Sequence, residues 1–112
     1  MGNAIPTKSR EQVKDRDDGQ CVRCGVSGSE WSHRRPRAVS GGHFQHCPCN
    51  GLWLCSTCHQ WCHAHPVQAR ETGFFVSSHE DAPYAIPVKT FYGWHTFDCD
   101  GSFHHHTQEN QP

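Results

Sequence analysis

Two Cys-x-x-Cys pairs frame the stretch of this chain that could do chemistry, Cys21 with Cys24 and Cys55 with Cys58. Four thiolates can fill a tetrahedral shell around zinc and leave no open position, which is typical of a structural site. In a small domain such a site can supply on the order of 10 kcal/mol of folding free energy. A redox-active pair or a disulfide framework are the alternatives, and the presence of two pairs favours one shared zinc.

Three histidines and an amide lie among these cysteines: His33, Asn50, His59 and His63. Phosphodiester hydrolysis needs a base for water, a cation for the phosphate charge and a group that orients the base. Imidazole, a divalent ion and a carboxamide suit these tasks. A lone histidine is more often a surface or packing residue, so the interpretation depends on the spacing relative to the cysteine pairs.

Arginines surround the first of these histidines, at positions 34, 35 and 37. The chain has a net charge of −1, but residues 1–40 hold eight of its ten Lys and Arg residues. Local positive charge matters more for phosphate binding than the total. We therefore expect Arg34, Arg35 and Arg37 to bind a nucleic-acid phosphate backbone without reading sequence. The alternative is a solvated arginine cluster.

Two elements must position these side chains. We expect a strand over residues 29–35. Because side chains alternate along a strand, Trp31 and His33 would lie on one face, and Ser32 and Arg34 on the other. A helix from about 56 to 64 stacks two histidines one turn apart, so that both can chelate one ion. Its cysteine at position 58 points about 100° away and can face the zinc. An irregular loop over residues 38–51 and an apolar run at 52–54 connect the two elements.

The flanking elements are a helix over 10–17 capped by Ser9, a helix from Pro66 closed by Gly73, a strand at 74–76 and a hairpin over 86–97. The chain has 112 residues and 34% hydrophobic content, which predicts one small domain with a modest core. No apolar leader and no membrane span are visible, so we expect a reducing cytoplasm, where such pairs favour zinc.

The motifs together resemble those of the zinc-containing HNH endonucleases, especially the short proteins encoded by bacteriophages. The resemblance covers residues 21–63, and less specifically the chain up to the hairpin. It rests on Cys21-x-x-Cys24-Gly, His33-Arg-Arg-Pro-Arg37 and Asn50-Gly-Leu-Trp-Leu-Cys55-x-x-Cys58-His59-x-x-x-His63. It implies a small α+β fold with a ββα-metal, treble-clef-like core, a four-cysteine structural zinc and a C-terminal β-hairpin.

The resemblance also implies a division of the chain and a set of roles. Residues 1–20 would be an arm with a short helix, 21–103 the nuclease domain with its core motif at 21–65, and 104–112 a disordered tail. His33 would activate water, Asn50 would hold that base, and His59 and His63 would bind a catalytic magnesium or manganese ion. The partner would be double-stranded DNA, with phage packaging proteins as further partners and the host bacterial cytoplasm as the location.

One position departs from the family pattern. A metal ligand usually precedes the base, but this chain has Ser32, whose neutral hydroxyl is a weak ligand. His43 and His46 in the loop are the other candidates for the missing ligand.

Four cysteines remain outside the paired set. Cys47 and Cys49 with His46 and Cys62 would make a second zinc site, but buried free thiols are the favoured interpretation for them and for Cys99. The second function that fits the sequence is a non-catalytic zinc-ribbon module that binds DNA or protein. A RING-like adaptor is disfavoured, because only Cys99 lies beyond residue 62.

Overall fold

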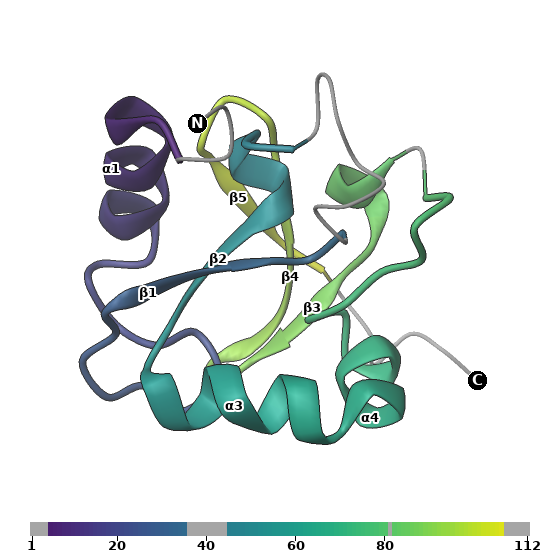
Figure 1. Cartoon of the computed structure of the whole chain (residues 1–112). Coiled ribbons are helices and arrows are strands. Elements are labelled where there is room, and N and C mark those ends of the chain that lie inside the picture. The colour runs from purple at the N-terminus through teal and green to yellow at the C-terminus, as the bar shows by residue number, and fades with distance from the viewer. Residues whose placement is uncertain (1–4, 36–44, 81, 107–112) are drawn as a thin grey trace.

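The central feature of the fold is a two-stranded antiparallel sheet that leads directly into a helix (Figure 1). The computed structural model describes residues 5–35, 45–80 and 82–106. Within them, helices and two small sheets pack into a unit of the α+β class, which confirms that part of the sequence prediction. No helix in these ranges is both long and apolar enough to cross a membrane.

The first sheet consists of β1 (Glu30–His33) and β2 (Gly51–Leu54). Trp31 lies opposite Trp53, and His33 lies opposite Gly51. Every residue of β2 is buried, so the short apolar run is a core strand. Gly51 has no side chain because the Trp31 ring occupies the space that a Cβ would need. The predicted strand at 29–35 is confirmed in a shorter form.

Helix α3 (Ser56–Ala64) begins immediately after β2, as the sequence predicts. Cys55 is its N-cap, and the sulfur accepts a hydrogen bond from Cys58 N at 3.4 Å. Helix α4 (Pro66–Glu71) follows after His65, with the proline in its first turn. Gly73 closes this helix at φ +82°, a left-handed conformation that favours glycine. The predicted helix from Pro66 is thereby confirmed, and its last residue is Glu71.

Helix α1 (Thr7–Arg16) begins earlier than predicted. Ser9 lies inside its first turn, and the capping position is taken by Pro6 without a side-chain cap, so the predicted capping role of Ser9 is wrong. Val13 is fully buried in a small cluster with the tryptophans of β1 and β2. The Arg16 guanidinium donates to Pro48 O at 2.9 Å and Gly51 O at 2.8 Å. Helix α1 thereby fixes the 3₁₀ turn η2 (Pro48–Asn50) against β2.

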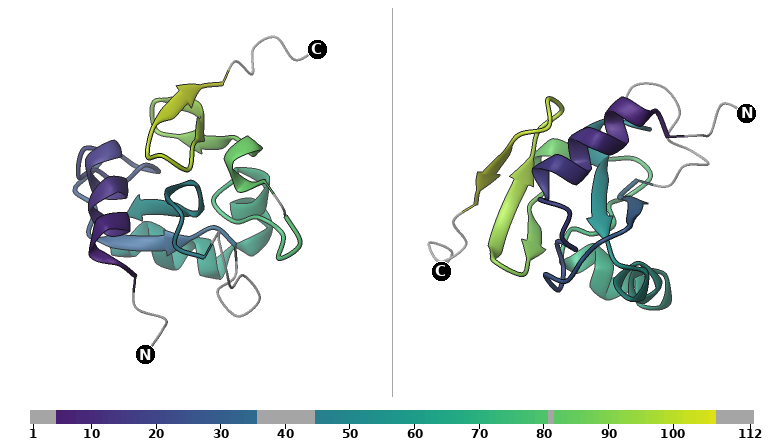
Figure 2. Two further views of the ribbon diagram at one scale, coloured as in Figure 1. Left: turned by 90° about the horizontal axis from the view of Figure 1, so that it is seen from above. Right: turned by 90° about the vertical axis from the view of Figure 1, so that its left-hand side faces the viewer.

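The second sheet is antiparallel and contains β3 (Val88–Thr90), β4 (Gly93–Phe97) and β5 (Phe103–His105). It forms a layer on one side of the molecule, beside β2 (Figure 2). The predicted hairpin corresponds to β3 and β4, and a short 3₁₀ turn η3 (Pro83–Ala85) precedes it. Val88 and Phe97 from this sheet enter the main core together with Leu52, Leu54 and Cys62.

Two further predicted features are wrong. Residues 74–76 form no strand, because Phe75 N donates to Ala69 O and Val76 N donates to Arg34 O instead of to a parallel or antiparallel neighbour. The predicted disordered tail begins too early, since His104 and His105 belong to β5 and pair with Thr96 and His95. Residues 107–112 lie outside the described ranges.

Candidate metal centre and histidine cleft

The four paired cysteines converge on one point, as the sequence predicts. The ligand atoms of Cys21, Cys24, Cys55 and Cys58 all lie within 4.8 Å of one another. Cys24 Sγ is 3.8 Å from Cys55 Sγ, and a tetrahedral zinc with Zn–S bonds of about 2.3 Å has S···S edges of about 3.8 Å. This group of thiols could therefore hold zinc without rearrangement of the chain.

The surroundings of these sulfurs act in both directions on their pKa values. Burial raises the pKa of the Cys21 thiol, but main-chain N–H groups of Cys55, Cys24 and Arg23 point at its sulfur and bring the pKa below its ordinary value. The Arg23 guanidinium also donates to Cys58 Sγ at 3.4 Å. Burial raises the pKa of Cys58 in spite of that contact. A divalent cation would offset the charge of four neighbouring thiolates.

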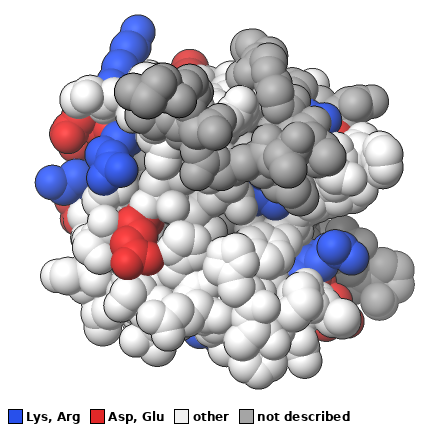
Figure 3. Space-filling model, viewed as in Figure 1, with Lys and Arg blue, Asp and Glu red and all other residues white. Residues whose placement is uncertain are grey.

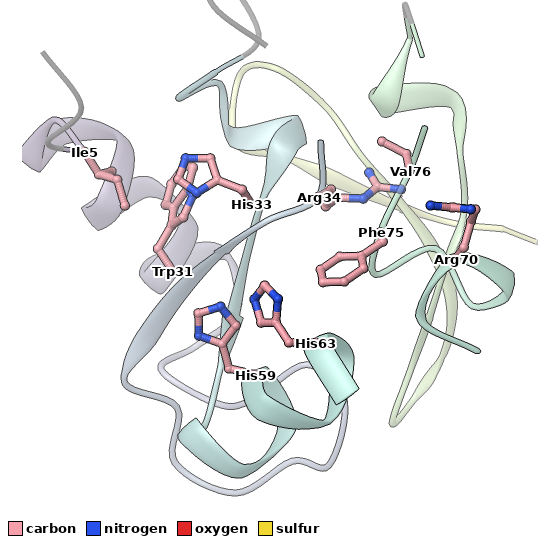
Figure 4. Close-up of a pocket in the computed structure, with 9 residues that line it drawn as sticks. All are labelled: Ile5, Trp31, His33, Arg34, His59, His63, Arg70, Phe75 and Val76. Carbon is pink, nitrogen blue, oxygen red and sulfur yellow. The ribbon is translucent and has the colours of Figure 1, made fainter. Parts of the chain in front are cut away.

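Three predicted histidines line one cleft of about 530 Å³. His33 comes from β1, while His59 and His63 come from α3, and all three rings point into the same space (Figure 4). The centroids of the His59 and His63 rings are 5.2 Å apart. The predicted convergence of the three imidazoles is thus confirmed. Trp31 and Phe75 supply part of the apolar wall.

Helix α3 faces both centres. Cys58 is 3% exposed and turns inward to the thiol cluster, whereas the next residue, His59, lines the cleft. The step of about 100° between successive helix residues separates the two directions. One helix therefore serves the thiol cluster with its first turn and the histidine cleft with its outer face.

Within the part of the chain that the structure describes, Asn50 makes no hydrogen bond to the imidazole that it was predicted to hold. It is fully buried, its side-chain oxygen accepts from Arg35 N at 2.8 Å, and its side-chain nitrogen donates to Gln45 O at 3.3 Å. Asn50 O accepts from Arg34 N at 2.9 Å. Asn50 therefore fixes the backbone just after His33 and does so through main-chain atoms rather than through the imidazole ring.

A carboxylate that the sequence analysis missed belongs to this site. Glu30 Oε1 lies 2.7 Å from His59 Nδ1. The two residues are far apart in the chain, and only the packing of α3 on β1 brings them together. No motif spacing marks Glu30, so the signal that could have identified it is its place one residue before Trp31 in the strand that carries His33.

Ser32 does not reach the cleft, so its predicted role as a weak metal ligand is wrong. Its side chain is on the opposite strand face from Trp31 and His33, as the alternation predicts, and it is 1% exposed. Its Oγ is buried without a hydrogen-bond partner among the described residues. Of the other candidate ligands, His43 lies outside the described ranges. His46 is not among the residues that line the cleft, and its ring centroid is 5.6 Å from that of His33.

Arg34 is a structural residue rather than a DNA clamp, which corrects the sequence prediction. Its guanidinium is 1% exposed and donates to four main-chain carbonyls, those of Gly73, Cys49, Pro83 and Ile86. Burial lowers the pKa of Arg34 to about 9, so the group remains charged at neutral pH. Arg34 borders the cleft, but four of its five N–H donors are already bonded to main-chain carbonyls.

The other arginines differ from one another. Arg35 is partly exposed, and its Nε donates to Ser78 O at 3.1 Å. Arg37 lies outside the described ranges. Arg70, which the sequence analysis did not select, is exposed at the edge of the cleft (Figure 4). On the face shown in Figure 3, Lys and Arg side chains gather over α1, and the surface over α3 is largely uncharged.

A second group of cysteines also converges, with a membership that the sequence analysis did not predict. Cys47, Cys49 and Cys99 have ligand atoms within 4.8 Å of one another. Cys62 is absent from this group and lies fully buried in the main core. Burial raises the pKa of Cys62 to about 11, as expected for an inert core thiol.

Comparison of the whole chain with models of known protein families, with curated proteins and with solved structures finds no match.

Proposed function

We propose that this protein is a metal-dependent endonuclease that hydrolyses DNA phosphodiester bonds in the histidine cleft. The observation that carries the proposal is the shared cleft of His33, His59 and His63. The order β1, β2, α3, with the thiol cluster at the start of the helix, supports a ββα-metal core of the HNH kind. Zinc in the four-cysteine cluster would be structural.

The chain's own residues suggest how the reaction would proceed. His33 accepts a proton from a water molecule as the water oxygen attacks phosphorus and the bond to the 3′-oxygen breaks. The departing oxygen takes up a proton from solvent, which balances the step. Asn50 keeps His33 in place through the backbone, and His59 and His63 would hold a magnesium or manganese ion. Such an ion, when bound, supplies Lewis-acid stabilisation of the phosphate charge.

The direct test is the conversion of supercoiled plasmid to the nicked form in the presence of Mg²⁺ or Mn²⁺. We expect His33→Ala to reduce the rate by roughly 100- to 10,000-fold, the usual contribution of a general base. The matched control is His79→Ala, which removes an exposed histidine that does not line the cleft. Equal nicking by the wild type and His33→Ala would refute the assignment of the base.

A second function is favoured by one specific observation. The residue before His33 is a buried serine, and within the described residues no third ligand atom clusters with His59 and His63. A non-catalytic zinc module that binds DNA or protein would need no such ligand. That function predicts DNA binding without cleavage and unchanged binding by His59→Ala.

A further inference from the structure

The convergence of Cys47, Cys49 and Cys99 needs an explanation of its own. Cys49 Sγ is 3.4 Å from Cys47 Sγ, and Cys99 Sγ is 3.5 Å from Cys49 Sγ. Cys99 belongs to the turn between β4 and β5, whereas the other two flank Pro48 at the start of η2. Two distant parts of the chain therefore place three sulfurs at one point.

The spacing suits a thiophilic divalent ion. Tetrahedral zinc with Zn–S bonds of about 2.3 Å requires sulfurs about 3.8 Å apart, and small shifts of side chains reach that value from the present positions. A Cys-x-Cys segment supplies two ligands from one short turn. Among biological divalent ions, zinc combines a preference for thiolates with tetrahedral geometry.

The cluster is buried on the side of Cys47 and Cys49 and exposed on the side of Cys99. Cys49 is 0% exposed and Cys47 is 8% exposed, while Cys99 lies at the surface. An ion held by these three sulfurs would be anchored on its inner side and reached by water from the side of Cys99. Three protein ligands plus water is an accepted zinc coordination.

Two buried guanidinium groups flank the same segment. Arg34 Nη1 donates to Cys49 O at 3.0 Å, and Arg16 Nη1 donates to Pro48 O at 2.9 Å. Arg16 is paired with the carboxylate of Asp17, whereas the guanidinium of Arg34 is bonded to main-chain carbonyls. Three thiolates around a divalent ion carry one net negative charge. Such a centre would supply a counter-charge for the buried Arg34, and a buried charge is costly without one.

We propose that Cys47, Cys49 and Cys99 bind a second zinc ion that ties η2 to the turn between β4 and β5. Asn50 directly follows Cys49, so this ion would also hold the segment that carries Asn50. The proposal stands apart from the nuclease function, because it concerns metal content and packing only.

The test is the zinc content of the full-length protein, produced without a metal-affinity tag and dialysed against a weak chelator. We expect two zinc ions per chain in the wild type and one in Cys99→Ser. Cys99 is exposed, so this variant should keep its fold. Cys62→Ala is the matched control and should retain two ions, because Cys62 belongs to neither group. Cobalt substitution should likewise show a thiolate charge-transfer band that is weaker in Cys99→Ser than in Cys62→Ala.

Two results would overturn the proposal. One is a wild-type zinc content that Cys99→Ser leaves unchanged, which would show that Cys99 holds no zinc. The other is an intact mass lower by two hydrogens with only one zinc bound, which would mean that two of the three sulfurs form a disulfide. A wild-type protein that binds two zinc ions but does not nick plasmid would refute the proposed function and leave this inference intact.

Discussion

His59 Nδ1 lies 2.7 Å from a carboxylate oxygen of Glu30, which joins the first residue of β1 to the outer face of α3. An ionised carboxylate can only accept, so Nδ1 donates its proton and the lone pair on Nε2 remains for a ligand. Carboxylates that orient metal-binding histidines in this way fix the tautomer and the direction of the ring. The contact therefore prepares His59 for the ion that the proposed function requires.

Replacement of Glu30 should weaken the proposed divalent site. We expect Glu30→Ala to raise the Mn²⁺ concentration needed for half-maximal nicking by roughly 10- to 100-fold, the usual effect of losing such a partner. The Mn²⁺ concentration that Glu30→Gln needs should lie between those of the wild type and Glu30→Ala. The amide oxygen of glutamine still accepts a hydrogen bond but carries no charge. Glu11→Ala removes an exposed carboxylate of α1 and serves as the control. An unchanged Mn²⁺ dependence in Glu30→Ala would contradict the role given to this residue.

The four-cysteine cluster should be needed for folding. Cys58→Ser removes a buried ligand, and loss of the zinc would remove on the order of 10 kcal/mol, comparable with the whole stability of a small domain. We expect a largely unfolded protein by circular dichroism, and the same spectrum for wild type treated with a strong chelator. Cys62→Ala should remain folded and sensitive to the chelator. A folded Cys58→Ser protein would show that the cluster is dispensable.

The burial of Arg34 predicts a large effect on stability. Arg34→Met leaves four carbonyls without their donor, those of Gly73, Cys49, Pro83 and Ile86. A buried group that loses its partner costs about 1–3 kcal/mol, so we expect a loss of at least about 3 kcal/mol in urea unfolding. Arg10→Met, on the exposed side of α1, should change stability by less than about 0.5 kcal/mol.

If the proposed function holds, we expect Arg70 rather than Arg34 to contact the DNA backbone. Arg70 is exposed at the edge of the cleft, where a guanidinium can contact a phosphate. Arg70→Ala should weaken DNA binding equally for different sequences and reduce the salt dependence of binding by about one counterion. Lys89→Ala, an exposed cation of β3 that does not line this cleft, is the control. If both variants bind DNA alike, Arg70 makes no phosphate contact.

Local patterns in the sequence predict the features that depend on neighbouring residues. The helix at α3 and the cysteine pairs follow from periodicity and spacing, and the alternation along β1 places Trp31 and His33 on one face. The sharing of one helix by two centres follows from the helical period alone. These predictions needed no knowledge of how distant segments pack.

The features that escaped prediction depend on distant contacts. Glu30 becomes a site residue only through the packing of α3 on β1, and Cys99 joins Cys47 and Cys49 only through the packing of the second sheet. Arg34 looked like part of a surface cluster, because charge alone does not reveal that its strand face is turned to the core. Strand β5 was missed because it has three residues, all exposed, and two of them are histidines, so it shows no apolar alternation.

His95 should make stability depend on pH. The residue is 4% exposed in β4, and its ring contacts Gly93 O at 3.2 Å and the His105 ring at 5.3 Å between centroids. Burial lowers the pKa of His95 below its ordinary value, with a smaller lowering contribution from His105. The folded state therefore holds the ring neutral where the unfolded chain already binds a proton.

This difference fixes the sign of the effect. The stabilisation that the neutral ring provides is complete above the ordinary histidine pKa of about 6.5 and is lost as the pH falls from there through the lower pKa of the folded state. We compare the unfolding free energies of zinc-saturated wild type and His95→Gln. The difference between them should be smaller at about pH 5.5 than at about pH 7.5. His79→Gln, at an exposed histidine, should show the same gap at both values. A gap for His95→Gln that stays constant or widens on acidification would mean that folding does not lower the pKa of His95.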